Sequence, residues 1–183
     1  MTKLKPVKNL LIGGPSTGKS TVLEALSDRG YWCFPEVSRE VTLEARQLGI
    51  EHLFLDEPLK FSEMLLKGRI KQFEKAEILY TQQVFIDRGI PDITAYMDHF
   101  NEDYPNEFVK ANKNYRYDHV FLFPVWNEIY TQDNERFEDL ELARNLQDAL
   151  IKTYEDLDYK LIEVPKFRIH DRIEFILNTI KSR

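Results

Sequence analysis

Short apolar runs alternate along this chain with longer stretches in which apolar residues recur every three or four positions. Short apolar runs are typical of buried strands, and the longer periodic stretches are typical of helices that pack one face against a core. The alternation therefore predicts an α/β fold with a mainly parallel sheet. The five strand candidates are Val7–Ile12, Tyr31–Phe34, Gln83–Ile86, His119–Phe123 and Tyr159–Val164.

Helical periodicity is clearest in three segments between and after these runs. The first ends before Gly49, the second follows Pro58, and the third lies near the carboxyl end. We expect each segment to pack an apolar stripe against the core. The stripes are Val37, Val41, Ala45 and Leu48; Leu65, Leu66, Ile70 and Phe73; and Ile169, Ile173, Ile176 and Ile180.

Length, composition and charge narrow the class of protein. The 183 residues, of which 43% are hydrophobic and 31% charged, predict a single domain spanning residues 1–183. The net charge of -6 does not favour binding to nucleic acid or anionic lipid. Cys33 is the sole cysteine, and the amino-terminal apolar run is too short for a signal peptide or a spanning helix. We expect a cytoplasmic protein that binds no nucleic acid and does not insert into a membrane.

The segment IGGPSTGKST, residues 12–21, has a pattern that binds phosphate. Gly13 is followed by four residues and then by Gly18, Lys19 and Ser20, between a predicted strand and a predicted helix. The glycines let backbone N–H groups converge on phosphate oxygens, the lysine adds a positive charge, and the serine hydroxyl can ligate Mg²⁺. The residues expected to bind the nucleotide are Gly13, Gly14, Pro15, Ser16, Thr17, Gly18, Lys19, Ser20 and Thr21.

Polar residues at two other strand ends belong to the same predicted edge of the sheet, where ligands of parallel sheets bind. Asp87 follows Val84–Ile86, so it can join Ser20 in holding Mg²⁺, or it can accept the proton of an attacking hydroxyl. Arg88 can hold a phosphate or an anionic substrate. Glu36 follows the second strand and can orient or deprotonate a substrate, which Arg39 would contact.

A polar segment after the fourth strand, PVWNEIYTQDNERFED, is a candidate lid. It carries Arg136, which would neutralise the transferred phosphoryl group as the lid excludes water. A solvated helix face is the alternative interpretation of this segment.

Two patterns typical of other nucleotide-binding proteins are missing. Asp87 is followed by Arg88 and not by the glutamate that many hydrolytic motors use to activate water. The nearest approach to a guanine-reading Asn-Lys-x-Asp sequence has Tyr115 in place of the aspartate. These absences favour phosphoryl transfer over motor-type hydrolysis or a guanine-specific switch.

Five segments together resemble the NadR-like P-loop family, whose members are described as predicted ATPases or AAA domains. They are GGPSTGKST, FPEVSRE, FIDRGIPDITAY, FPVWNEIYTQDNERFEDLELA and YKLIEVP, and the resemblance extends from Val7 to about Leu177. It implies a kinase-like fold with five parallel strands flanked by helices, and it implies ATP and Mg²⁺ as ligands. The family includes ribosylnicotinamide kinase domains and relatives that bind GTP and phosphoinositides, so the resemblance leaves the substrate open.

The leading hypothesis from the sequence is a small-molecule kinase that transfers the γ-phosphoryl group of ATP to a hydroxyl of a nucleoside-like acceptor. Its expected catalytic residues are Lys19, Asp87, Glu36 and Arg136, with Glu36, Arg39 and Arg88 toward the substrate and Ser20 and Asp87 toward Mg²⁺. Two alternatives stay open: a non-catalytic nucleotide-binding switch and a slow ATPase. The sequence also leaves open which carboxylate acts as the base, the choice of ATP or GTP, and the oligomeric state.

Overall fold

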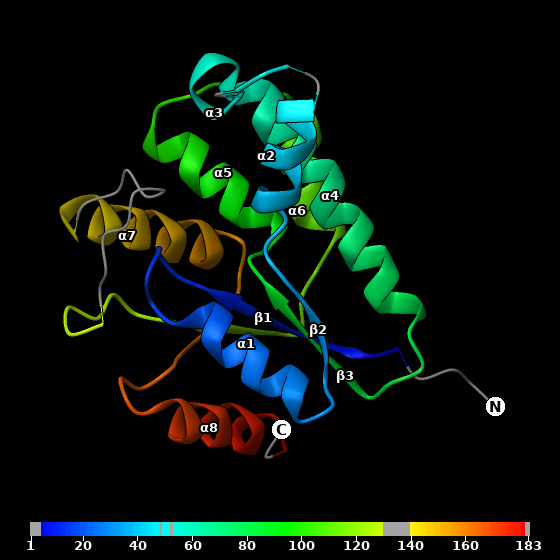
Figure 1. Ribbon diagram of the computed structural model, residues 1–183, viewed down its shortest axis with the longest axis vertical. Helices are drawn as coiled ribbons and strands as arrows, with labels where there is room; N and C mark the ends of the chain where they lie inside the picture. Colours follow the sequence, from blue (N-terminus) through cyan, green and yellow to red (C-terminus); the bar gives the residue numbers. More distant parts are fainter. Residues whose placement is uncertain (1–4, 48, 52, 130–139, 182–183) are drawn as a thin grey trace.

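The apolar runs of the sequence form one five-stranded parallel sheet with the strand order β2-β3-β1-β4-β5 (Figure 1). The computed structural model describes residues 5–47, 49–51, 53–129 and 140–181. The central strand β1 pairs with β3 on one side and β4 on the other. The strands are β1 Val7–Ile12, β2 Trp32–Phe34, β3 Gln83–Asp87, β4 His119–Leu122 and β5 Leu161–Glu163.

Helices cover both faces of the sheet, because successive strand residues point to opposite sides. Leu10 and Ile12 pack into one core with α4, α5 and α7, whereas Leu11 packs into a second core with α1 and α8. Figure 1 shows α1 and α8 side by side below the sheet and α5 and α7 above it. These helices are α1 Lys19–Asp28, α4 Pro58–Ile78, α5 Ile90–His99, α7 Leu140–Asp156 and α8 Ile169–Lys181.

A third apolar cluster lies away from the sheet, within the helices that follow β2 and β3. It joins α2 and α3 to parts of α4, α5 and α6 through buried residues such as Val41, Leu66 and Phe108. The short helices are α2 Ser38–Gln47, α3 Leu53–Asp56 and α6 Asn106–Asn114. This cluster fixes α2 beyond the carboxyl end of β2, on the side of the phosphate-binding pattern (Figure 1).

The structure confirms the predicted α/β fold and places every predicted strand within a few residues of its expected position. The β5 strand is shorter than expected, and β3 extends by one residue to Asp87. Gly49 follows α2 with a φ of 82°, the left-handed conformation with which helices often end. In the described part of the chain, no helix has both the length and the apolar character needed to cross a membrane.

Candidate functional site

The phosphate-binding pattern forms a tight loop between β1 and α1. Its backbone takes left-handed φ values at Ser16 and Gly18, of 55° and 82°. Gly13 has a φ of 142°, and a Cβ built on it would lie 2.3 Å from the carbonyl oxygen of Phe123. The loop conformation therefore requires glycine at position 13, for lack of space as well as for its backbone angles.

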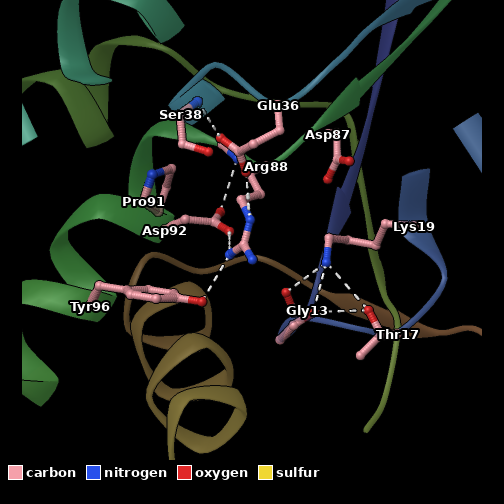
Figure 2. Close-up of polar contacts among 12 residues, drawn as sticks. Gly13, Thr17, Lys19, Glu36, Ser38, Asp87, Arg88, Pro91, Asp92 and Tyr96 are labelled. Carbon is pink, nitrogen blue, oxygen red and sulfur yellow. Dashed lines mark hydrogen bonds and ion pairs between the residues drawn. The ribbon is translucent and has the colours of Figure 1, made fainter. Parts of the chain in front are cut away.

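Lys19, the first residue of α1, is buried and folds back over this loop (Figure 2). Its Nζ donates hydrogen bonds to the carbonyl oxygens of Gly13 and Gly14 at 2.9 and 2.8 Å. It also donates to Thr17 Oγ1 at 3.3 Å. Burial, with a smaller effect of the nearby Arg88 charge, lowers the pKa of Lys19 to about 8. Phosphate oxygens at the loop would offset this cost, because they supply negative charge to a desolvated ammonium group.

Ser20 and Asp87, the two residues expected to hold Mg²⁺, lie side by side. Ser20 Oγ donates to Asp87 Oδ2 at 3.3 Å, whereas Asp87 Oδ1 is buried and has no hydrogen-bond partner among the described residues. Burial raises the pKa of Asp87, and the Lys19 charge opposes that shift. Among the described residues, no group of three or more His, Cys, Asp or Glu side chains is placed to hold a metal ion. Mg²⁺ in nucleotide sites takes few protein ligands and the rest from phosphate and water, so Ser20 and Asp87 fit that role.

Glu36 follows β2 and contacts two arginines, of which Figure 2 shows Arg88. Its Oε1 is 3.0 Å from Arg69 Nη2, and its Oε2 is 2.5 Å from Arg88 Nε. The backbone N–H of Ser38 also donates to Oε1, at 3.2 Å. Burial acts to raise the pKa of Glu36, but the two guanidinium charges outweigh it and lower the pKa below the ordinary value. Glu36 is therefore a fixed, ionised carboxylate at neutral pH.

Arg88 is held from several directions. Its backbone has a φ of 65°, and its N–H donates to the carbonyl oxygen of Leu11 at 3.0 Å. Its side chain donates to the Tyr96 hydroxyl at 3.1 Å and lies 3.6 Å from Asp92 Oδ1. Asp92 in turn accepts from the Tyr154 hydroxyl at 2.5 Å. This network joins the end of β3 to α5 and α7, and it holds the Arg88 side chain by contacts with Tyr96 and Asp92.

Most of the predicted site residues lie together at the carboxyl ends of β1, β2 and β3. The charges of Asp87, Arg88 and Glu36 all lie close enough to Lys19 to affect its pKa, so the phosphate loop and the Glu36–Arg88 pair are neighbours. Thr21 is exposed on α1. Arg39 is exposed on the first turn of α2 and forms no hydrogen bond or ion pair with any residue that the structure describes. Arg136 lies outside the described residues.

Three residues of the network, the buried Arg69 and Asp92 and the half-buried Tyr96, were not predicted from the sequence, although each carried a signal. Arg69 occupies the same helical stripe as Leu65 and Phe73, spaced by four residues, so a charge there needs a buried partner. Asp92 and Tyr96 follow Arg88 at intervals of four and so lie on one side of α5. Periodicity alone could have placed Arg69 on a buried stripe and Asp92 and Tyr96 on one side of their helix, but it identifies no partner for any of them.

Comparison with known proteins finds the same fold in several solved structures. Thymidylate kinase from Candida albicans is 16% identical, with a TM-score of 0.73 over 97% of this chain and 92% of that one. Deoxyadenosine kinase from M. mycoides with bound dATP is 20% identical, with a TM-score of 0.66 over 96% and 100%. NadR protein in complex with NR is 16% identical, with a TM-score of 0.71 over 97% of this chain and 50% of that one.

This chain thus spans half the length of the NadR chain that it resembles. No curated protein matches its sequence significantly. The family model described as AAA domain matches residues 8–172, which include the phosphate loop, Glu36 and the Asp87-Arg88 pair. The chain therefore belongs to this AAA domain family.

Proposed function

We propose that this protein is an ATP-dependent kinase that transfers the γ-phosphoryl group to a hydroxyl of an uncharged, nucleoside-like acceptor. The observation that carries the proposal is the position of Glu36, an ionised carboxylate fixed beside the phosphate loop by Arg69 and Arg88. A phosphoryl acceptor needs a group that orients its hydroxyl toward the γ-phosphate, and a rigid carboxylate serves that purpose.

The phosphate loop would hold the nucleotide. Its backbone N–H groups and the amino end of α1 would bind the phosphates, and Lys19 would exchange its contacts to Gly13 and Gly14 for phosphate oxygens. Ser20 and Asp87 would hold Mg²⁺, which neutralises charge on the phosphates when it is bound. The orphaned Asp87 Oδ1 supports this role.

Glu36 would accept a hydrogen bond from the acceptor hydroxyl. Its lowered pKa makes it a weak base, which suits phosphoryl transfer, because the loose transition state needs little removal of the proton before the new bond forms. Asp87 is directed toward the proposed Mg²⁺ position, so we assign the acceptor to Glu36. Arg39, exposed one helical turn beyond Glu36, is proposed to contact the acceptor. The role of Arg136 at the transferred phosphoryl group stays a prediction from the sequence.

Charge balance supports an uncharged acceptor over a nucleoside monophosphate. Arg69 and Arg88 face Glu36 and Asp92, so two positive charges meet two negative ones. An acceptor phosphate would bring about two further negative charges, and it would have to displace one of these carboxylates to reach Arg69 or Arg88. A neutral acceptor leaves the network intact.

The test is nucleotide turnover with a panel of acceptors. Pure protein is incubated with ATP and Mg²⁺, and ADP release is measured with nucleosides, including nicotinamide riboside, and with the matching monophosphates. Release that depends on a nucleoside supports the proposal. Release only with monophosphates would contradict the uncharged acceptor, turnover without any acceptor would indicate an ATPase, and binding without turnover would indicate a switch. Lys19→Ala should abolish nucleotide binding, and unchanged binding would refute the phosphate-loop assignment.

A further inference from the structure

Arg172, in the first turn of α8, contacts the phosphate loop from a position 155 residues away in the sequence. Its Nη1 donates a hydrogen bond to the carbonyl oxygen of Thr17 at 2.9 Å. A Cβ built on Gly18 would lie 2.4 Å from Arg172 Nη2, so the guanidinium group packs directly against the Thr17–Gly18 peptide. No step of the function proposed above uses Arg172.

Arg172 differs from Arg69 and Arg88 in having no carboxylate beside it in the described part of the chain. The side chain is 5% exposed, and it forms no ion pair with any residue in the described ranges. Its Nε is buried without a hydrogen-bond partner there. The guanidinium carbon lies 5.5 Å from the centre of the Phe123 ring and 5.7 Å from that of Trp126. Burial lowers the pKa of Arg172, as expected for a charge that aromatic rings compensate only in part.

The contact with Thr17 has a consequence for the opposite side of the same peptide. In a trans peptide unit the C=O and the N–H point in opposite directions. A guanidinium that holds the Thr17 carbonyl on the outside of the loop therefore directs the Gly18 N–H away from itself, toward the inside where phosphate binds. The positive charge on the carbonyl also polarises the peptide and makes this N–H a stronger donor.

We propose that Arg172 is a positioning residue for nucleotide phosphate, acting through the Thr17–Gly18 peptide. The inference rests on the nucleotide binding proposed above. In the free protein the guanidinium is a buried charge with no counterion among the described residues, and phosphates bound on the other side of the peptide supply negative charge. Arg172 thus weakens the free protein slightly and strengthens its complex with nucleotide.

Arg172→Met tests this inference, because methionine keeps an apolar stem over Phe123 and removes the charge. We expect the melting temperature of the free protein to stay equal or rise, and the Kd for Mg²⁺-ATP to increase at least about tenfold. Arg172→Lys keeps a charge but not the planar donor, so its Kd should lie between the two. The matched control is Arg168→Met, an exposed arginine four residues earlier, which should leave both quantities unchanged.

A purely structural role predicts the opposite pattern. If Arg172→Met lowers the melting temperature while its Kd for Mg²⁺-ATP stays within about twofold of wild type, the inference is wrong. If the methionine variant does not fold, a wild-type Kd for Arg172→Lys overturns the inference by the same criterion. A wild-type protein that binds no Mg²⁺-ATP at all refutes the proposed function instead, so the two failures are distinguishable.

Discussion

Glu36 and Arg88 form an ion pair in which Oε2 and Nε lie 2.5 Å apart, although the two residues follow different strands. The pairing of β2 with β3 explains the contact. Phe34 is in register with Ile86, and each member of the ion pair comes two positions later, just beyond the end of its own strand. The parallel register thus brings an ionised carboxylate to the edge of the sheet that also carries the phosphate loop.

Replacing Glu36 by glutamine should remove transfer without removing nucleotide binding. Glutamine retains the size of the side chain but lacks the negative charge of the carboxylate, which is proposed to accept a hydrogen bond from the substrate hydroxyl. We therefore expect kcat to fall about 10²–10⁴-fold. The Kd for Mg²⁺-ATP should change little, because Lys19 and the loop stay in place. Steady-state kinetics and a binding titration separate the two effects. Glu40→Gln, on the exposed side of α2, is the control, and an equal kcat in both variants would rule out the assignment of Glu36.

Replacing Asp87 by asparagine should change the dependence on Mg²⁺. Asp87 Oδ1 is buried and has no hydrogen-bond partner in the part of the chain that the structure describes. A bound cation or a proton would compensate its charge. We expect the Mg²⁺ concentration for half-maximal ATP turnover to rise about 10–100-fold. A Mg²⁺ titration at saturating ATP measures this shift. The control is Asp28→Asn, at the exposed end of α1, which should show the wild-type dependence on Mg²⁺. A wild-type dependence in Asp87→Asn as well would show that this carboxylate holds no metal.

The sequence contained enough information to predict the sheet and the centre of the site. The strands were predictable because each is a buried apolar run, and the loop was predictable because glycine, lysine and serine at fixed spacing have few other uses. Arg39 shows that a position after a strand does not tell which way a side chain points, because that depends on its angle around the helix. Val41 lies on the buried stripe of α2, and Arg39, two positions earlier, points about 200° away from it, which agrees with the exposure of Arg39.

Contacts between distant elements could not be predicted from local patterns. Arg69 contacts Glu36 because α4 crosses the end of β2, and Arg172 contacts Thr17 because α8 packs beside α1. Neither pairing follows from sequence spacing, since the crossing of two helices depends on the side chains between them. The phosphate loop was therefore predictable as a motif, but its supporting arginines were not.

Nucleotide binding near pH 8 should take up protons through Lys19. The pKa of this buried lysine is about 8 in the free protein, below its ordinary 10.5, and bound phosphates will raise it. At pH 8 about half of the free protein lacks this proton, so binding should take up about half a proton per site. Calorimetry of ATP binding in buffers of different ionisation enthalpy measures the uptake. A binding enthalpy independent of the buffer at pH 8 would show that the pKa of Lys19 is not lowered.

The same shift makes the stability of the free protein depend on pH. Below about pH 8 Lys19 is charged in the folded and unfolded states, and burial of that charge costs stability. Between about pH 8 and 10.5 the folded state loses the proton first, so this group makes the folded state more stable as pH rises. Lys19→Met should lack this rise, which urea unfolding of both proteins across the range will show.

Replacing Gly89 by alanine should destabilise the fold through crowding alone. The φ of Gly89 is -109°, which any residue adopts, but an added Cβ would lie 2.6 Å from the Tyr154 hydroxyl and 2.7 Å from Leu10 Cδ2. We expect a loss of about 1–3 kcal/mol in the free energy of unfolding, measured with urea. In a Tyr154→Phe background the hydroxyl is absent, so the same substitution should cost less. Equal costs in the two backgrounds would show that the crowding lies elsewhere.

Arg69 offers a test of how the Glu36 cluster is stabilised. Arg69 is 4% exposed, and it donates to Glu36 and, at 2.6 Å, to the carbonyl oxygen of Gly89. Arg69→Met removes both contacts and leaves Glu36 with a single guanidinium, so we expect the free energy of unfolding to fall by about 3 kcal/mol. Lys71→Met, on the exposed side of the same helix, is the control and should change it by less than about 0.5 kcal/mol.

Combining Arg69→Met with Glu36→Gln distinguishes a charge effect from a packing effect. Glutamine in place of Glu36 no longer needs a counterion, so Arg69→Met should cost about 1–2 kcal/mol less in that background than in wild type. Urea unfolding of the four proteins gives this coupling energy directly. If the two substitutions are additive, Arg69 stabilises the protein through Gly89 and the packing of α4, and Arg88 alone accounts for the lowered pKa of Glu36. A coupling of the expected size instead means that two guanidinium groups keep Glu36 ionised, as orientation of an acceptor hydroxyl requires.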